Sequence, residues 1–438
     1  MMPPSRYCAA LLAALTAGCV ARGQDAPMFR GNLAHTGVYA APEIRKLSGI
    51  KWQFHTSGRV ISSPAVANGV AYVGSTDGRL YAVDMASGTQ RWVDSTTARI
   101  TSSPAVDGGG VFFTSYDGQV YRVNAATGKV EWTFATEGER RFAGKHLHGY
   151  LPVGETMPDP YDVFLSSPAV WHGTVYVGSG DGNVYAIDAR SGQRVWAFRT
   201  GNVVHASPAV VDGTVYIGSW DTYLYALDAA SGRVNWRFKT GEDPKISNQT
   251  GIQSSAAVVD GVVYFGCRDS KLYAVDAQTG QQKWSFDNKG SWVVSSPAVR
   301  DGVVYFVTSD SRLLHALDAG TGKPVFSLQL GWFLFSSPAI AGDMLYVGSW
   351  DGTLTAVDLR THGQAWVFET DASRHNRAKY GKPDGSLNPE TFVTEAFYDD
   401  LPVEIDKLST AGSILSSPIV VRGGILVGSA DGNLYDLN

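Results

Sequence analysis

A short stretch of the chain, ERRFAGKHLHGYLPVG at residues 139–154, concentrates side chains that can bind ligands or ions. Five of them fall within nine positions: Arg140, Arg141, Lys145, His146 and His148. The two histidines share one face if the segment is extended, but a zinc site needs at least a third protein ligand. The arginines are candidates for holding an anion. The alternative is a solvent-exposed loop, so the position of this stretch in the fold must be established first.

The sequence on both sides of this stretch is repetitive. The clearest copy of the repeat, SSPAVWHGTVYVGSGDGNVYAIDARSGQRVWAFRT at residues 166–200, has four apolar segments separated by HG, GDG and RSG. Glycine next to Asp, Asn or Ser favours tight hairpin turns, and β-branched and aromatic residues favour strands. Each copy therefore predicts a four-stranded antiparallel meander.

Eight copies of this unit can be counted by the residue that follows their paired serines. That residue is Pro64, Pro104, Pro168, Pro208, Ala256, Pro297, Pro338 and Pro418. A period near 40 residues with four strands per repeat is typical of a β-propeller blade. The last copy lacks a tryptophan-containing strand, and residues 50–58 (IKWQFHTSG) supply one at the front. We predict an all-β, eight-bladed β-propeller over residues 50–438, closed by the N-terminal strand completing the C-terminal blade.

The repeats resemble the pyrroloquinoline quinone (PQQ)-type repeat family. The segments AVDMASGTQRW, AIDARSGQRVW, ALDAASGRVNW and AVDAQTGQQKW are similar to its tryptophan-docking motif, and MFRGNLAHTG resembles the start of many exported members. Asn124 replaces the motif Asp in the second unit, and Phe326 replaces Trp in the seventh. The resemblance implies the fold but not an activity. Quinoprotein dehydrogenases and the non-enzymatic propeller lipoprotein of the outer-membrane β-barrel assembly machine share these repeats.

The dehydrogenases of this family hold the quinone beneath a disulfide of adjacent cysteines and above Ca²⁺, with an aspartate as base. The three cysteines of this chain are Cys8, Cys19 and Cys267. Export would leave Cys267 alone, so no such disulfide can form, and we interpret Cys267 as a packed residue at a strand end. We expect no catalytic residue and no cofactor. The alternative is a PQQ- and calcium-dependent dehydrogenase with its site in the central funnel.

The N-terminus has the features of a targeting segment. Arg6 precedes the apolar run YCAALLAALTAGCV, and small residues follow, so residues 1–23 are interpreted as a signal peptide and residues 24–49 as a lead segment. LTAGC resembles a lipobox that would anchor lipid at Cys19, but Thr16 stands where such boxes carry an aliphatic residue. We expect export, in a bacterium to the periplasm or cell envelope. The net charge of -5 does not favour nucleic acid, and no later segment is apolar enough to suggest a membrane span.

Three connections between repeats are longer than the others. They fall near residues 136–163, 241–252 and 371–413, each after a tryptophan strand and before the next paired serines. Equivalent connections emerge on one face of a propeller, and insertions gathered on one face mark a binding face. The stretch at residues 139–154 belongs to the first of them.

The same face should include the residues that precede each innermost strand. Arg59 and Arg99 lie on one side of the predicted funnel, and Trp292 and Trp332 lie opposite. His205 and Gln253 complete the set of candidate ligand-binding residues. Such a funnel could bind an anionic, planar or carbohydrate ligand. Our leading hypothesis is a scaffold that binds an envelope protein or small ligand at this face; the alternatives are a quinone-dependent alcohol or sugar dehydrogenase and a glycan- or polymer-binding propeller.

Overall fold

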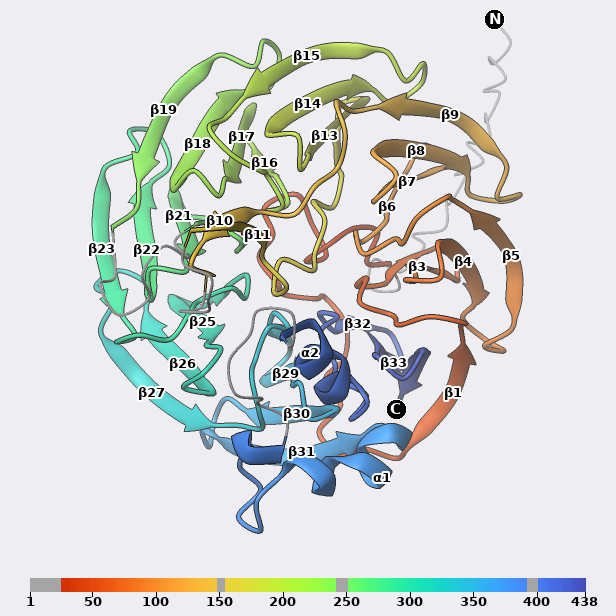
Figure 1. The fold of residues 1–438 in the computed structure, drawn as a ribbon, viewed down its shortest axis with the longest axis vertical. Coiled ribbons are helices and arrows are strands. Elements are labelled where there is room, and N and C mark those ends of the chain that lie inside the picture. The colour runs from red at the N-terminus through yellow and green to blue at the C-terminus, as the bar shows by residue number, and fades with distance from the viewer. Residues whose placement is uncertain (1–24, 148–153, 242–250, 392–400) are drawn as a thin grey trace, which may run out of the picture.

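The computed structural model describes residues 25–147, 154–241, 251–391 and 401–438. The predicted signal peptide, Cys19, His148 and most of the second insertion lie outside these ranges. Within them, eight four-stranded antiparallel sheets surround a common axis, which confirms the predicted eight-bladed propeller (Figure 1).

The strands of the first seven blades follow one another from the axis outward. The first four blades are β2 (Ala65–Ala67), β3 (Val70–Gly74), β4 (Arg79–Asp84) and β5 (Gln90–Ser95); β6 (Ala105–Asp107), β7 (Gly110–Ser115), β8 (Gln119–Asn124) and β9 (Val130–Ala135); β12 (Ala169–Trp171), β13 (Thr174–Gly178), β14 (Asn183–Asp188) and β15 (Arg194–Arg199); and β16 (Ala209–Val211), β17 (Thr214–Gly218), β18 (Tyr223–Asp228) and β19 (Val234–Lys239). The next three are β20 (Ala257–Val259), β21 (Val262–Gly266), β22 (Lys271–Asp276) and β23 (Gln282–Asp287); β24 (Ala298–Arg300), β25 (Val303–Val307), β26 (Leu313–Asp318) and β27 (Pro324–Gln329); and β28 (Ala339–Ala341), β29 (Met344–Gly348), β30 (Thr353–Asp358) and β31 (Gly363–Glu369).

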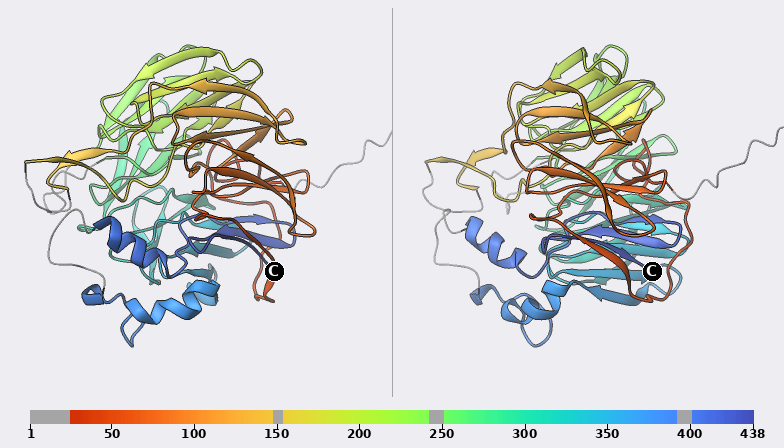
Figure 2. Two further views of the ribbon diagram at one scale, coloured as in Figure 1. Left: turned by 45° about the vertical axis from the view of Figure 1, so that its right-hand side comes forward. Right: turned by 90° about the vertical axis from the view of Figure 1, so that its right-hand side faces the viewer.

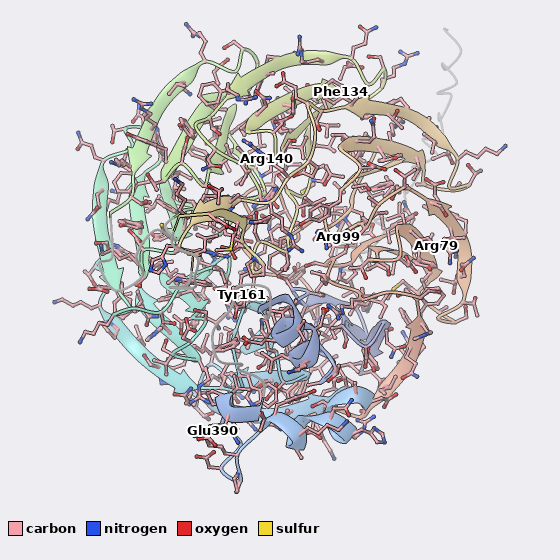
Figure 3. The ribbon with its side chains drawn as sticks, viewed as in Figure 1. Arg79, Arg99, Phe134, Arg140, Tyr161 and Glu390 are labelled. Carbon is pink, nitrogen blue, oxygen red and sulfur yellow. The ribbon has the colours of Figure 1, made fainter. Side chains whose placement is uncertain are left out.

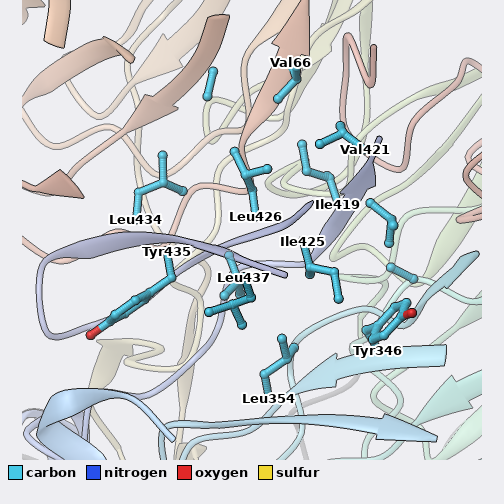
Figure 4. Close-up of a cluster of buried hydrophobic side chains, with 14 of the residues drawn as sticks. Val66, Tyr346, Leu354, Ile419, Val421, Ile425, Leu426, Leu434, Tyr435 and Leu437 are labelled. Carbon is cyan, nitrogen blue, oxygen red and sulfur yellow. The ribbon is translucent and has the colours of Figure 1, made fainter. Parts of the chain in front are cut away.

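The eighth blade combines strands from both ends of the described chain. It contains β32 (Ile419–Val421), β33 (Gly424–Gly428), β34 (Asn433–Leu437) and, outermost, β1 (Ile50–His55), which pairs antiparallel with β34. Trp52 of β1 packs on Gly88 of the first blade, where an added Cβ would lie 2.7 Å from the indole. Figure 4 shows the buried core of this blade, which reaches Val66 of the first blade and Tyr346 of the seventh. The predicted ring closure is confirmed.

A second closed ring, made of hydrogen bonds, surrounds the axis. The second serine of each pair donates its backbone N–H to the serine Oγ of the next blade, at 2.8–3.1 Å. The members are Ser63, Ser103, Ser167, Ser207, Ser255, Ser296, Ser337 and Ser417. All eight are buried. The repeated SSP motif therefore links each blade to the next around the channel.

The tryptophans on the outermost strands also join neighbouring blades. The indole N–H of Trp92, for example, donates to the carbonyl of Ala125 in the next blade at 3.0 Å. In the second unit Asn124 keeps the turn, because its Oδ1 accepts N–H groups as the motif Asp does. Phe326 stacks on His362 at 4.3 Å instead of donating a hydrogen bond. The two departures from the motif thus change local contacts without interrupting the ring.

The lead segment crosses the propeller beyond the serine ring. Its carbonyls accept N–H groups from six innermost strands: Val66 to Ala26, Val106 to Pro27, Val210 to Leu33, Val258 to Ala34, Val299 to Thr36 and Ile340 to Gly37. In the sequence, each of these donors comes shortly after its ring serine. The segment therefore lies on the far side of the ring from the residues that precede the serines.

The described parts of the insertions lie on one face of the disc. The first insertion forms a hairpin of β10 (Ala143–Lys145) and β11 (Thr156–Pro158). The third contains α1 (Asp371–Tyr380), the 3-10 helix η2 (Pro389–Thr391) and α2 (Leu401–Ser409). Both views in Figure 2 place these elements on the same side of the blades. None of the described helices is long and apolar enough to span a membrane.

Candidate functional site

The first insertion folds inward over the mouth of the central channel. Phe142, just before β10, stacks on Trp220 with ring centroids 4.3 Å apart. Beyond β11, Tyr161 packs edge-on against Trp292 at 5.7 Å and Trp350 at 6.3 Å. Figure 3 shows Tyr161 toward the centre of the disc. The insertion is therefore held by aromatic side chains from three different repeats.

A buried histidine joins this insertion to the wall of the funnel. The Nδ1 of His205 lies 2.7 Å from Asp162 Oδ1, and its Nε2 lies 2.9 Å from Glu139 Oε1. Burial alone lowers the pKa of His205, but the charge of Asp162 and the hydrogen bonds to Asp162 and Glu139 raise it to about 10. The ring is thus an imidazolium at neutral pH, and both N–H groups are engaged. His205 acts as an ionic cross-link and has no free nitrogen for a ligand.

Arg268 fixes the same insertion from the next repeat. Its guanidinium lies between two indoles, 4.3 Å from the Trp220 ring centroid and 4.2 Å from that of Trp292. Nη1 donates to Asp159 Oδ2 at 2.5 Å, while Nε and Nη2 donate to Gln253 Oε1 at 3.1 and 2.7 Å. The Arg268 and Asp159 side chains are both fully buried. The candidate ligand residue Gln253 therefore supports Arg268 beneath the insertion.

The third insertion covers another part of the channel mouth. Helix α2 directs Ile405 and Leu408 into a buried apolar cluster that includes Trp332 and Trp350. The indole N–H of Trp332 donates to the carbonyl of Gly385 at 3.2 Å. The two insertions and the propeller therefore share one apolar core at this face.

A cleft of about 390 Å³ stays open between the two insertions. Its lining consists of Arg59, Ile61, Thr76, Arg99, Thr101, Arg141, Pro160, Val163, Ile405 and Asp406. Arg59 pairs with Asp406 of α2 at 2.8 Å. The guanidinium of Arg99 lies 4.0 Å from the centroid of the Tyr116 ring. The structure thus brings together three of the predicted arginines, Arg59, Arg99 and Arg141.

The other predicted residues lie outside this cleft. Arg140 is exposed and donates from Nε to the carbonyl of Gly180 at 2.9 Å. His146 follows β10 with φ of 51°, and His148 falls outside the described ranges. Trp292 is 8% exposed and Trp332 is 0% exposed, so neither presents an open ring face to a sugar. Among the residues whose positions are described, no three His, Cys, Asp or Glu side chains converge as metal ligands.

Comparison with protein families gives one match, which covers most of the chain. The family described as outer membrane protein assembly factor BamB matches residues 44–148, 154–288 and 284–379. The chain belongs to this family. Comparison with curated proteins finds no match.

Solved structures with the same fold include relatives of two kinds. BamB from Moraxella catarrhalis is 16% identical, with a TM-score of 0.66 over 90% of this chain and 100% of that one. A europium-containing methanol dehydrogenase is 16% identical, with a TM-score of 0.70 over 94% of this chain and 98% of that one. The quinohemoprotein alcohol dehydrogenase from Comamonas testosteroni is 15% identical, with a TM-score of 0.68 over 95% of this chain and 81% of that one. At these identities the likeness to the BamB structure and to the dehydrogenases shows the fold alone.

The axial chamber of this BamB-family chain is small for the quinone of the dehydrogenases that share the repeats. The chamber measures about 40 Å³ and is lined by the serine ring, by Phe29 from the lead segment and, among others, by Phe164, His205 and Gln253, which precede the ring serines. Pockets for ligands of that size are typically about 300–1,000 Å³. Cys267 is buried and free, and the chain has no adjacent cysteine pair. The fused rings and carboxylates of PQQ cannot be accommodated among these side chains.

The residues that hold the insertions were not anticipated from the sequence. They are Glu139, Asp159, Asp162, Arg268 and Asp406. One of them, Arg268, could have been found by comparing equivalent positions of the repeats. Arg268 is the only charged residue at a position that is otherwise Thr76, Tyr116, Gly180, Trp220, Ser309, Trp350 and Ala430. The acidic residues lie within the insertions, which have no counterpart in the other repeats.

Proposed function

We propose that the chain is an exported protein-binding scaffold of the cell envelope. It binds its partner through the insertion face, defined as residues 139–147, 154–163, 371–391 and 401–411. The observation that carries this proposal is that buried ion pairs and aromatic contacts fix the first insertion, and an apolar cluster fixes the third, over one end of the channel. A surface held in place before binding loses less conformational entropy when a partner binds.

The family and the chemistry of the surface support this function. The family is described as an outer membrane protein assembly factor, so a partner in outer-membrane protein assembly is proposed. The insertion face exposes charged side chains of both signs, namely Arg140, Lys145, Glu155, Arg374, Lys379, Lys382, Asp384, Glu390 and Asp406. A polar rim of this kind is typical of protein interfaces that form between separately folded partners.

Charge reversal on this face tests the proposal. Lys145→Glu with Lys379→Glu should reduce the amount of a specific envelope protein that copurifies with the chain. The matched control is Lys129→Glu with Arg194→Glu, which changes the same net charge on exposed residues outside the insertion face. An equal yield of the partner from both double variants would contradict a role for the insertion face. Deleting residues 371–413 is a poorer test, because the deletion would expose Trp332 and Trp350.

A quinone-dependent dehydrogenase is the second candidate, favoured by the fold shared with two dehydrogenases. Incubation with PQQ and Ca²⁺, followed by absorption spectroscopy and a dye-linked assay with alcohols and sugars, tests it directly. Stoichiometric quinone binding with turnover would favour this candidate over the scaffold. We expect no turnover, because the axial chamber is too small for the quinone.

A further inference from the structure

The cleft between the two insertions contains more cationic groups than its own acids neutralise. Arg59, Arg99 and Arg141 line it, with Asp406 as the one carboxylate in the lining. Asp406 pairs with Arg59, and its side chain is 64% exposed. In the part of the chain that the structure describes, neither Arg99 nor Arg141 has a carboxylate within ion-pair distance. Two guanidinium groups therefore lie in the cleft without a direct ion pair, although Asp162 is close enough to interact with Arg99 electrostatically.

Two buried donors in the lining have no hydrogen-bond partner among the described residues. One is Nε of Arg141, and the other is Oγ1 of Thr101. Thr101 is only 3% exposed, so bulk water does not solvate its hydroxyl freely. Buried polar groups in folded proteins are nearly always hydrogen-bonded. Both side chains line the cleft, so an acceptor from outside the chain that binds there can satisfy them, although Thr101 also borders the axial chamber.

The neighbouring acids do not supply that acceptor. The buried carboxylates Asp162 and Glu139 both hydrogen-bond to His205, and the buried Asp159 pairs with Arg268. Counting Arg59, Arg99, Arg141 and protonated His205 against Asp406, Asp162 and Glu139 leaves one positive charge. Burial lowers the pKa of Arg99; Tyr116 and Asp162 oppose this shift, whereas the nearby Arg141 adds to it, so the two arginines repel each other in the cleft.

The shape of Arg99 and the rest of the lining indicate the kind of ligand. Arg99 lies over the Tyr116 ring, and a guanidinium held in this way can direct in-plane N–H groups to a planar or tetrahedral oxyanion. Apart from Thr76, the rest of the lining is apolar and consists of Ile61, Pro160, Val163 and Ile405. A hydrated inorganic ion would make no favourable contact with this apolar wall. An organic anion would pair its charged group with the arginines and pack its apolar part against this wall.

We propose that this cleft binds a small organic acid, with its carboxylate held by Arg99, Arg141 and Thr101 and its apolar body against Ile61, Pro160, Val163 and Ile405. The cleft volume of about 390 Å³ lies within the range of small-molecule sites. This site is independent of the proposed partner-binding function, since the arginines and the apolar wall do not require a protein partner.

Calorimetry on the full chain with acetate, hexanoate, hexanol and inorganic phosphate tests this site. Hexanoate should bind at least about ten-fold more tightly than acetate or phosphate because of the apolar wall, and hexanol should not bind measurably. Arg99→Ala and Arg141→Gln should each weaken hexanoate about ten-fold or more, and Asp406→Asn should strengthen it by removing a competing carboxylate. The control Arg194→Ala removes an exposed arginine on β15 and should leave binding unchanged.

Several results would overturn the assignment. One is the absence of hexanoate binding to the native chain at millimolar concentration, and another is an equal loss in Arg194→Ala and Arg99→Ala. Binding of a peptide with a free C-terminal leucine carboxylate, but not of hexanoate, would assign the site to a protein end instead of a small acid. If the cleft variants unfold, competition between hexanoate and chloride on the native chain gives the answer, because a site without a charge requirement would show no salt dependence.

Discussion

The backbone N–H of Ser417 donates to Oγ of Ser63 at 2.9 Å, although 354 positions separate the two residues. This bond is the last of the eight that encircle the channel, and it joins the C-terminal blade to the first. The pairing of β1 with β34 closes the same blade at its outer edge. The propeller is therefore closed twice, once at the axis and once at the rim.

The inner closure makes a prediction about stability. Ser63→Ala removes the acceptor of a buried N–H and should lower the free energy of unfolding by about 1–3 kcal/mol. Urea unfolding followed by circular dichroism measures this change. Ser57→Ala, at an exposed serine in the same segment, should stay within about 0.5 kcal/mol of the native chain. A similar effect at both positions would show that the ring bond contributes little.

The His205 ion pairs predict a loss of stability in alkaline solution. The unfolded histidine has an ordinary pKa near 6.5. In the folded state burial lowers the pKa, but Asp162 and Glu139 outweigh burial and raise the pKa to about 10. Since the folded state holds the proton more tightly, this stabilisation is complete below pH 6.5. It is lost by about 1.4 kcal/mol per pH unit up to pH 10. Urea unfolding of the native chain and of His205→Gln should show a difference that shrinks over this range. A constant difference would contradict the imidazolium.

The buried Asp436 leads to a second pH-dependence prediction, with the same sign but at acidic pH. Burial raises the pKa of Asp436 to about 6, although Lys51 lies 3.3 Å away and lowers it. The folded state therefore holds this proton more tightly than the unfolded state, and stability falls as the pH rises from about 4 to 6. Asp436→Asn should melt at a higher temperature than the native chain at pH 8, with the gain absent at pH 4. Asp107→Asn, at an exposed aspartate, should produce no such pH-dependent gain.

The contacts of Arg268 lead to a prediction about how firmly the first insertion is held. Arg268→Lys keeps the charge but loses the planar group between Trp220 and Trp292 and its forked hydrogen bonds to Gln253. We expect trypsin to cleave within residues 139–147 about ten-fold faster, which corresponds to about 1.4 kcal/mol of lost local stability. The control is Arg194→Lys, which should leave the cleavage rate unchanged. Equal rates in all three chains would show that the insertion is held by other contacts.

The fold was predictable because its determinants recur along the chain. The paired serines, the turn glycines and the docking tryptophans each mark the same place in successive repeats, so strand number, ring closure and the common face of the insertions follow from spacing. Arg59 and Arg99 line the cleft at the channel mouth, and the repeat defines their positions there, while ligand binding by them stays a prediction.

The site inside the insertions was less predictable for a physical reason. Asp162 reaches His205 across 43 positions and Asp159 reaches Arg268 across 109, and no periodic pattern fixes such contacts. The open funnel expected opposite Arg59 is filled by Tyr161, Phe164 and the helix α2, which cover Trp292 and Trp332. How the insertions fold back on the ring depends on tertiary packing that the repeat does not encode.

Site-specific photo-crosslinking in the native cell envelope tests the proposed function most directly. A photoreactive amino acid is placed at Lys145 or Lys379 on the insertion face, and at Val195 or Val325 on exposed outer strands. The scaffold proposal predicts a discrete adduct with the same envelope protein from both insertion-face positions and none from the outer strands. Adducts formed only from Val195 and Val325, with none from Lys145 and Lys379, would contradict it.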